Sequence, residues 1–158
     1  GARFAVMYLT DVSTVIVVRH AEKALESQDD PPLSDAGRAR AERLAQMLSG
    51  PSDAGPVRQV FSSDARREQQ TAAPLASRLR LDVQSIPGRD TDAIVRALRG
   101  RGRGQTSVVV GHSDTVPQIV AALTDGRYRV TLEESDYGSM FVVSLSSFGP
   151  PQVLRLRY

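Results

Sequence analysis

The chain has 158 residues, of which 41% are hydrophobic and 24% are charged. This length suits a single domain over residues 1–158 that buries its own core, and the composition excludes a disordered or collagen-like chain. Lysine and arginine number 20 against 18 aspartate and glutamate, so the formal net charge is only +2. An excess this small does not by itself indicate a nucleic-acid-binding surface.

Cysteine is absent, which excludes disulfides, a thiolate nucleophile and zinc or iron–sulfur sites built on cysteine. No apolar run approaches the ~18 residues that suggest a membrane helix. The stretch from Phe4 to Val18 is interrupted by polar residues and does not indicate an intact signal peptide. The default expectation is a cytoplasmic protein with no membrane partner. A leader removed upstream of Gly1 would instead make the protein secreted or periplasmic.

Short apolar runs and amphipathic segments alternate along most of the chain. The β-branched run Thr14–Val18 predicts a buried strand. Ala21–Leu33 is polar, contains two prolines and is expected to be a loop. Ser34 can cap a helix over Asp35–Ser49, whose apolar residues recur with the helical period. A Gly-Pro pair ends this helix.

The alternation continues through the middle of the chain. A second strand is expected at Val57–Phe61, followed by a helix over Ala65–Arg80 that Pro74 should kink or split. A third strand, Leu81–Ile86, precedes a short helix that Asp90 or an aspartate two residues later can cap.

The last third begins with the arginine-glycine run Arg99–Gly104, which is expected to be a loop. A fully buried strand at Thr106–Val110 leads into a helix over Val116–Leu123. Two strands, Ser139–Leu145 and Val153–Tyr158, end the chain and are expected to be partly antiparallel. Strands that alternate with helices imply a mostly parallel sheet covered on both faces, so we predict one three-layer α/β/α sandwich.

The two histidines of the chain each follow a buried strand directly. Arg19-His20 follows the first strand, Arg67 comes shortly after the second, and His112 follows the strand at 106–110. Ligands of open α/β sheets bind at this edge, beyond the carboxyl ends of the strands. A lone histidine there is usually structural, but four cationic or cation-capable groups at one edge repel one another. A phosphate dianion would relieve that repulsion, and arginine matches its geometry.

These residues also form motifs. Arg19-His20-Ala21-Glu22 resembles the RHG signature of the histidine phosphatase superfamily, which includes the phosphoglycerate mutases, with Ala21 where the family often has glycine. The segment Ser62–Ala72 resembles the family's second motif, in which an arginine stands four residues before a Thr-Ala pair. That register selects Arg67 rather than Arg66.

Two further segments extend the resemblance from Val15 to about Leu123. Gly111-His112-Ser113 is similar to the segment that carries the family's second histidine. Pro32-Leu33-Ser34 with Gly37 fits the LS-x-x-G pattern that opens the family's first helix. The resemblance implies a phosphoglycerate mutase-like fold and a phosphatase that needs neither a metal nor a cofactor.

The implied mechanism places His20 as the nucleophile that forms a phosphohistidine, which water then hydrolyses. Arg19, Arg67 and His112 would hold the phosphoryl oxygens, and their charges should lower the pKa of His20. A backbone carbonyl that accepts from the other ring N–H would fix the tautomer of His20. The full set of expected substrate-binding residues is Arg19, Glu22, Arg67, His112 and Ser113.

The general acid is where the sequence departs from the family pattern. Many members carry a glutamate roughly two dozen residues after the second arginine, in a local motif that is missing here. Asp90 is our first candidate by position, and its competing role is to cap a helix. The other candidates are Asp92, Asp114 and Glu22. A phosphoramidate leaving group can be protonated without a strong enzymic acid, so the gap favours phosphohistidine substrates.

The chain has little room for the extra segments with which mutases enclose a sugar phosphate. Only the loop Ala21–Leu33 and the region Ser85–Asp92 are available as a lid, so we expect an open pocket and hydrolysis of a phosphorylated small molecule or phosphoprotein. The main alternative is a phospho-ligand binding module without turnover. A nucleic-acid binder that uses its arginines and a metallohydrolase are weaker alternatives.

Overall fold

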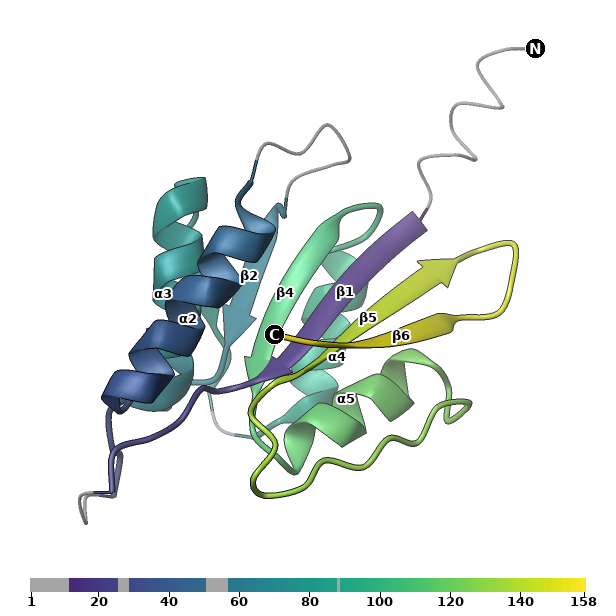
Figure 1. Cartoon of the computed structure of the whole chain (residues 1–158). Coiled ribbons are helices and arrows are strands. Elements are labelled where there is room, and N and C mark those ends of the chain that lie inside the picture. Colours follow the sequence, from purple (N-terminus) through teal and green to yellow (C-terminus); the bar gives the residue numbers. More distant parts are fainter. Residues whose placement is uncertain (1–11, 26–28, 51–56, 88) are drawn as a thin grey trace.

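The computed structural model describes residues 12–25, 29–50, 57–87 and 89–158, so residues 4–11 of the N-terminal apolar stretch lie outside it. One six-stranded sheet has the order β3-β2-β4-β1-β5-β6 (Figure 1). Its strands are β1 (Val12–Arg19), β2 (Gln59–Ser62), β3 (Val83–Ser85), β4 (Thr106–Gly111), β5 (Ser139–Ser146) and β6 (Gln152–Arg157). The helices are α2 (Asp35–Leu48), α3 (Arg66–Leu79), α4 (Thr91–Gly100) and α5 (Thr115–Leu123).

Four adjacent strands of the sheet pair in parallel. β1 pairs with β4, β4 with β2, and β2 with β3, all in parallel. β5 runs antiparallel to β1, and β6 antiparallel to β5. The predicted three-layer sandwich around a mostly parallel sheet is therefore confirmed, and so is the antiparallel end of the chain.

Two apolar cores lie on opposite faces of the sheet because side chains alternate along each strand. In β1, Val15 and Val17 pack with residues of α4 and α5, whereas Ile16 and Val18 pack with residues of α2 and α3. Figure 1 shows these two helix pairs on either side of the sheet. A strand covered on both faces must be apolar throughout, which explains the continuous β-branched runs of β1 and β4.

Two sequence expectations about the helices are wrong. Pro74 does not split α3, which is unbroken from Arg66 to Leu79. The buried face of α3 outweighs the single backbone hydrogen bond that proline removes. Arg99 and Gly100, expected in a loop, belong to α4. The Arg99 guanidinium anchors this last turn by donating to the Ala122 carbonyl at 2.9 Å.

The start of α2 explains the glycine of the LS-x-x-G motif. Ser34 caps the helix as predicted, and its hydroxyl accepts from the Gly37 N–H at 3.1 Å. A Cβ on Gly37 would lie 2.1 Å from the Glu22 carbonyl oxygen. The loop that follows β1 therefore packs directly on the backbone of α2.

We predict that Gly37→Ala destabilises the protein by about 1–3 kcal/mol, the usual cost of overpacking. This loss would appear even though alanine favours an exposed helix by about 1 kcal/mol over glycine. The matched control is Gly100→Ala, because a Cβ on this helical glycine meets nothing within 4 Å. Urea unfolding measures both. An equal change of midpoint in the two variants would contradict the close packing at Gly37.

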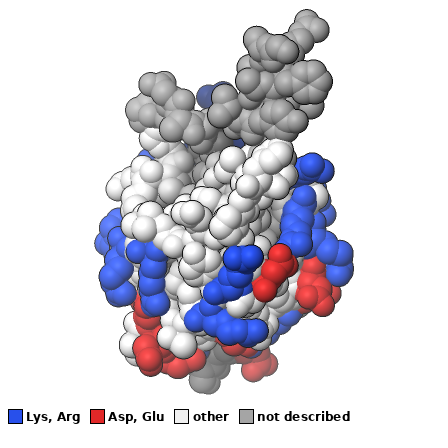
Figure 2. All heavy atoms as spheres, turned by 90° about the vertical axis from the view of Figure 1, so that its right-hand side faces the viewer, with Lys and Arg blue, Asp and Glu red and all other residues white. Residues whose placement is uncertain are grey.

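Charges on the β6 side of the molecule are mixed. Figure 2 shows that the lysine and arginine side chains on this face form separate groups, with aspartate and glutamate between them. Such a surface differs from the continuous basic stripe typical of nucleic-acid binders. No helix in the described part of the chain is long and apolar enough to cross a membrane.

Candidate active site

The two histidines meet at the carboxyl ends of two adjacent strands. β1 and β4 are neighbours, with Arg19 paired opposite Gly111 at the end of their ladder. The backbone N–H of His20 then donates to the Gly111 carbonyl at 2.8 Å. The His20 and His112 ring centroids are 5.6 Å apart at 75°, and both residues are buried. Parallel pairing thus brings together two residues that are distant in the chain.

The ring of His20 is held in one tautomer. Its Nδ1 lies 2.8 Å from the Ala21 carbonyl oxygen, which can only accept, so the ring proton is on Nδ1. The Nε2 of His20 faces Arg67, whose Nε donates to it at 3.2 Å. The expectation that a backbone carbonyl fixes the tautomer is therefore confirmed. With the ring proton on Nδ1, the Nε2 lone pair of His20 is directed into the site.

Burial lowers the pKa of His20 from its ordinary value of 6.5 to about 3, against the opposing hydrogen bond to Ala21. The positive charges of Arg67 and Arg19 and the neighbouring His112 contribute to this lowering of the pKa. The charges act in the direction that the sequence predicted, but desolvation is the larger cause. At neutral pH, His20 is an uncharged imidazole with a free lone pair.

We predict that the His20 ring stays neutral down to about pH 4 in the folded protein, well below the ordinary histidine range. The unfolded chain takes up this proton near 6.5 and the folded chain only near 3, so falling pH between these values destabilises the fold. ¹⁵N NMR titration can follow His20 because the chain has only two histidines. A His20 midpoint above pH 6 would contradict this environment.

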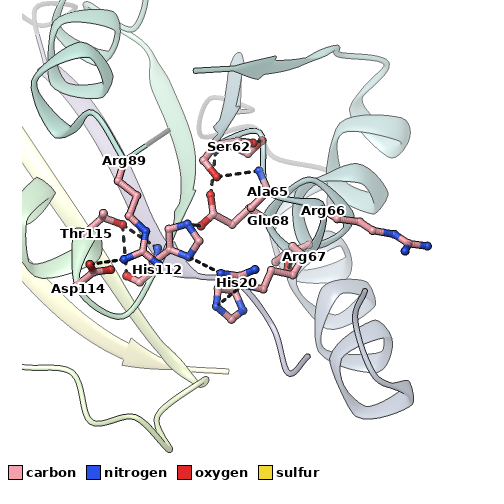
Figure 3. Close-up of polar contacts among 12 residues, drawn as sticks. His20, Ser62, Ala65, Arg66, Arg67, Glu68, Arg89, His112, Asp114 and Thr115 are labelled. Carbon is pink, nitrogen blue, oxygen red and sulfur yellow. Dashed lines mark hydrogen bonds and ion pairs between the residues drawn. The ribbon is translucent and has the colours of Figure 1, made fainter. Parts of the chain in front are cut away.

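Arg67, in the first turn of α3, bridges the two imidazoles. Its Nε donates to His20 Nε2 at 3.2 Å, and its Nη2 lies 3.3 Å from His112 Nδ1. Figure 3 shows both rings turned toward Arg67, while Arg66 points away from them. Thr71 ties the same turn to the loop after β1, because its hydroxyl accepts from the Ala21 N–H and donates to the Arg67 carbonyl.

Arg19 is buried beside the site and is held by the segment between α5 and β5. Its Nη1 donates to the Glu134 carbonyl at 2.6 Å and to the Asp136 carbonyl at 3.2 Å. Its guanidinium stacks on the ring of Tyr137, 4.0 Å from the centroid. The sequence did not indicate this support from residues 134–137. No pattern along the chain links residues 134–137 to the end of β1.

Glu68 is a second residue that the sequence analysis missed. Its side chain is fully buried, accepts from the Ser63 N–H at 3.0 Å, and places Oε1 2.5 Å from His112 Nε2. Helical periodicity could have found it, because Glu68 lies one turn before Ala72 on the buried face of α3. A glutamate in a polar run is usually exposed, so Glu68 was not expected in the site from the sequence.

The structure gives the predicted proton donors other partners. Asp90 caps α4, accepting from the Ala93 N–H at 2.9 Å, and Asp92 lies exposed in the first turn of that helix. The Asp114 carboxylate lies 2.7 Å from the guanidinium of Arg89. A catalytic role for any of them stays a prediction.

Two expected substrate-binding residues also have partners. The Glu22 carboxylate binds the guanidinium of Arg40 at 2.9 Å. The Ser113 hydroxyl donates to Glu134 Oε1 at 3.2 Å. A phosphate could still displace the exposed Glu134 carboxylate from Ser113, so that role stays a prediction.

A hollow of about 360 Å³ opens beside His112 and Arg67. Both segments expected to border the pocket contribute to it, the first through Asp29 and Asp30 and the second through Arg89. Among the residues that the structure describes, no three His, Asp or Glu side chains are grouped to hold a metal ion. The hollow is thus lined by imidazole, guanidinium and carboxylate groups.

The site lies on an α/β sandwich, with the two histidines paired at one edge of its sheet. Residues 15–90 match the model of the histidine phosphatase superfamily (branch 1). The chain is 35% identical over 74 residues to phosphoglycerate mutase-like protein 4 of Arabidopsis thaliana, a match that spans 43% of this chain and 31% of that protein. The chain therefore corresponds to about a third of that curated relative.

Solved structures share the whole fold. The protein histidine phosphatase SixA, complexed with tungstate, superposes with a TM-score of 0.70 at 22% identity, covering 91% of this chain and 96% of that one. A mycobacterial glucosyl-3-phosphoglycerate phosphatase gives a TM-score of 0.65 at 16% identity, with 93% and 98% covered. The match to the superfamily model over residues 15–90 agrees with the motifs in the sequence, and the shared fold extends the likeness over most of the chain.

Proposed function

We propose that this protein is a cofactor-independent phosphatase that hydrolyses phosphate monoesters or protein phosphohistidine through a covalent phosphohistidine on His20. The observation that carries the proposal is the state of His20. Its Nδ1 proton is bound by the Ala21 carbonyl, its pKa is lowered to about 3, and its Nε2 lone pair faces Arg67. An uncharged, oriented imidazole is what nucleophilic attack on phosphorus requires.

In the proposed reaction, His20 Nε2 attacks phosphorus and the bond to the leaving group breaks in line. The phosphoryl oxygens take over the donors of Arg67 that now point at the two rings, and Arg19 adds positive charge from the end of β1. Water then attacks the phosphohistidine and releases phosphate. His20 recovers its lone pair, so the cycle closes without a metal or cofactor.

The proteins that share this fold support both substrate classes. One is a protein histidine phosphatase and the other a glucosyl-3-phosphoglycerate phosphatase. Tungstate, bound in the first, is a tetrahedral oxyanion like phosphate. These likenesses favour a phosphorylated substrate for this chain and leave the leaving group open.

The test is hydrolysis of p-nitrophenyl phosphate and of a phosphohistidine-bearing protein by the full chain in excess chelator. We expect turnover of at least one substrate at a rate that the chelator does not change. Phosphate binding without turnover of either would establish the binding-module alternative in its place. Loss of turnover on chelation would contradict a mechanism carried by His20 alone.

A further inference from the structure

The site holds a buried carboxylate that the reaction proposed above does not use. Glu68 is fully buried at the start of α3, below the ring of His112. One of its oxygens accepts from the Ser63 N–H at 3.0 Å. Its other oxygen lies 2.5 Å from His112 Nε2, an ion-pair contact, and has no hydrogen-bond partner among the described residues. A carboxylate is strongly disfavoured in such a place unless a partner compensates it.

The neighbours of His112 fix where its proton sits. Arginine can only donate, so the Arg67 Nη2 at 3.3 Å requires a lone pair on His112 Nδ1. The ring proton must then be on Nε2, the nitrogen that faces Glu68. The two histidines are therefore opposite tautomers, with His20 protonated on Nδ1 and His112 on Nε2. The unprotonated nitrogens, His20 Nε2 and His112 Nδ1, both face the guanidinium of Arg67 (Figure 3).

We propose that Glu68 is a positioning residue that makes His112 the proton donor of the reaction. It holds the Nε2–H of His112, turns Nδ1 toward the phosphate site, and balances the positive charge when Nδ1 takes up a proton. This inference rests on the proposed function. The carboxylates of Asp90, Asp114 and Glu22 are engaged with other partners. His112 would therefore serve as the general acid for which the sequence showed no motif.

The proton transfers balance over one catalytic turnover. A phosphate monoester loses its last proton near pH 6, so its monoanion is available to the enzyme. On binding, the P–OH proton passes to His112 Nδ1, and the imidazolium is paired with Glu68. His20 Nε2 then bonds to phosphorus. The P–O bond of the ester breaks, and the leaving oxygen keeps the electron pair and takes the proton from His112.

The second half of the reaction returns every group to its starting state. Water attacks phosphorus and gives a proton to His112 Nδ1, and the N–P bond to His20 breaks. The proton then returns to phosphate, which leaves as its monoanion. The other titratable and charged groups around His112 are Arg67 on α3, His20 after β1, and Arg89 with its partner Asp114. Three aspartates also line the hollow: Asp29, Asp30 and Asp64.

The inference names a substrate class. An alkoxide is a poor leaving group and needs a proton as the P–O bond breaks, whereas p-nitrophenolate leaves unprotonated. With Glu68 and His112 in place, phosphate esters of aliphatic alcohols are substrates, not only phosphoramidates. The missing acid motif favoured phosphohistidine substrates. A proton donor at His112 instead predicts that esters of aliphatic alcohols are hydrolysed as well.

The first test is Glu68→Gln with two esters, p-nitrophenyl phosphate and glycerol 2-phosphate. The amide keeps the size of the side chain and an acceptor for Ser63, but it cannot balance an imidazolium. We expect kcat/KM for glycerol 2-phosphate to fall by about 10²-fold or more, the range of general acid catalysis. The loss for p-nitrophenyl phosphate should be at least tenfold smaller, a difference of about 1.4 kcal/mol or more.

A matched control is Glu42→Gln, which neutralises a half-exposed surface glutamate paired with Arg78 and should change neither rate. Equal losses for both esters in Glu68→Gln would overturn the inference, since a structural defect does not distinguish leaving groups. Absence of wild-type hydrolysis would overturn the proposed function instead. The second measurement below still decides the role of Glu68 in that case.

The second measurement is the ring protonation of the wild-type histidines, read from long-range ¹⁵N–¹H NMR at neutral pH. It needs neither turnover nor a folded variant. We expect His20 to carry its proton on Nδ1 and His112 on Nε2. A proton on Nδ1 of neutral His112 would overturn the inference, because Glu68 would then not hold the ring as proposed.

Discussion

Replacing His20 by alanine is expected to lower kcat/KM by on the order of 10⁴-fold or more, as loss of a covalent nucleophile does in other enzymes. The residue supplies the lone pair that attacks phosphorus, and no other imidazole can take its place. The other histidine, His112, has its Nε2 against Glu68 and acts as the proton donor in the reaction proposed above. Steady-state hydrolysis of p-nitrophenyl phosphate measures the loss.

The fold of His20→Ala must be checked because the side chain is buried. Its unfolding midpoint and its affinity for inorganic phosphate serve as controls, since Arg67 and His112 remain. A variant that is folded and binds phosphate but does not turn over would assign the chemistry to His20. A variant that keeps more than about a tenth of the wild-type rate would show that another group attacks phosphorus.

Arg67→Lys is expected to lower kcat by about 10²–10³-fold, the scale seen when a preorganised donor to the transition state is lost. The change keeps the charge, but an ammonium group is a single point of contact. It cannot reach two rings with the rigid fork that spans His20 Nε2 and His112 Nδ1. The loss should therefore appear although the formal charge of the site is unchanged.

The neighbouring residue provides the matched control. Arg66 lies in the same turn of α3 and its side chain points away from the rings (Figure 3). Arg66→Lys should leave kcat within about twofold of the wild type, the scale of an ordinary surface change. Similar losses in the two variants would mean that charge alone, rather than the geometry of Arg67, matters to the reaction.

Much of the fold could be predicted because it depends on local patterns. The apolar run of β4 needs burial on both faces, and that requirement implies helices on both sides of a parallel sheet. The approach of His20 to His112 followed from the same reasoning, since parallel strands end at one edge. The motif register also selected Arg67 over Arg66, and the structure places only Arg67 against the rings.

The rest of the site depends on contacts between distant segments. Nothing near Arg19 in the chain indicates that the carbonyls of Glu134 and Asp136 hold it. The proton-donor candidates were chosen by their distance along the chain from the second arginine. That distance does not show which side chains of α3 are buried against the sheet. Glu68 was closer to Arg67 than any of them and lay one helical turn before the apolar face.

The most direct test of the account is to trap the covalent intermediate. The full chain would be mixed with a ³²P-labelled phosphate substrate, quenched within milliseconds in alkali, and digested for mass spectrometry. We expect label on the protein that is stable in alkali and labile in acid, as for an N–P bond, and that maps to His20. Label on His112 or on a hydroxyl, or hydrolysis with no labelled protein at any quench time, would contradict the mechanism.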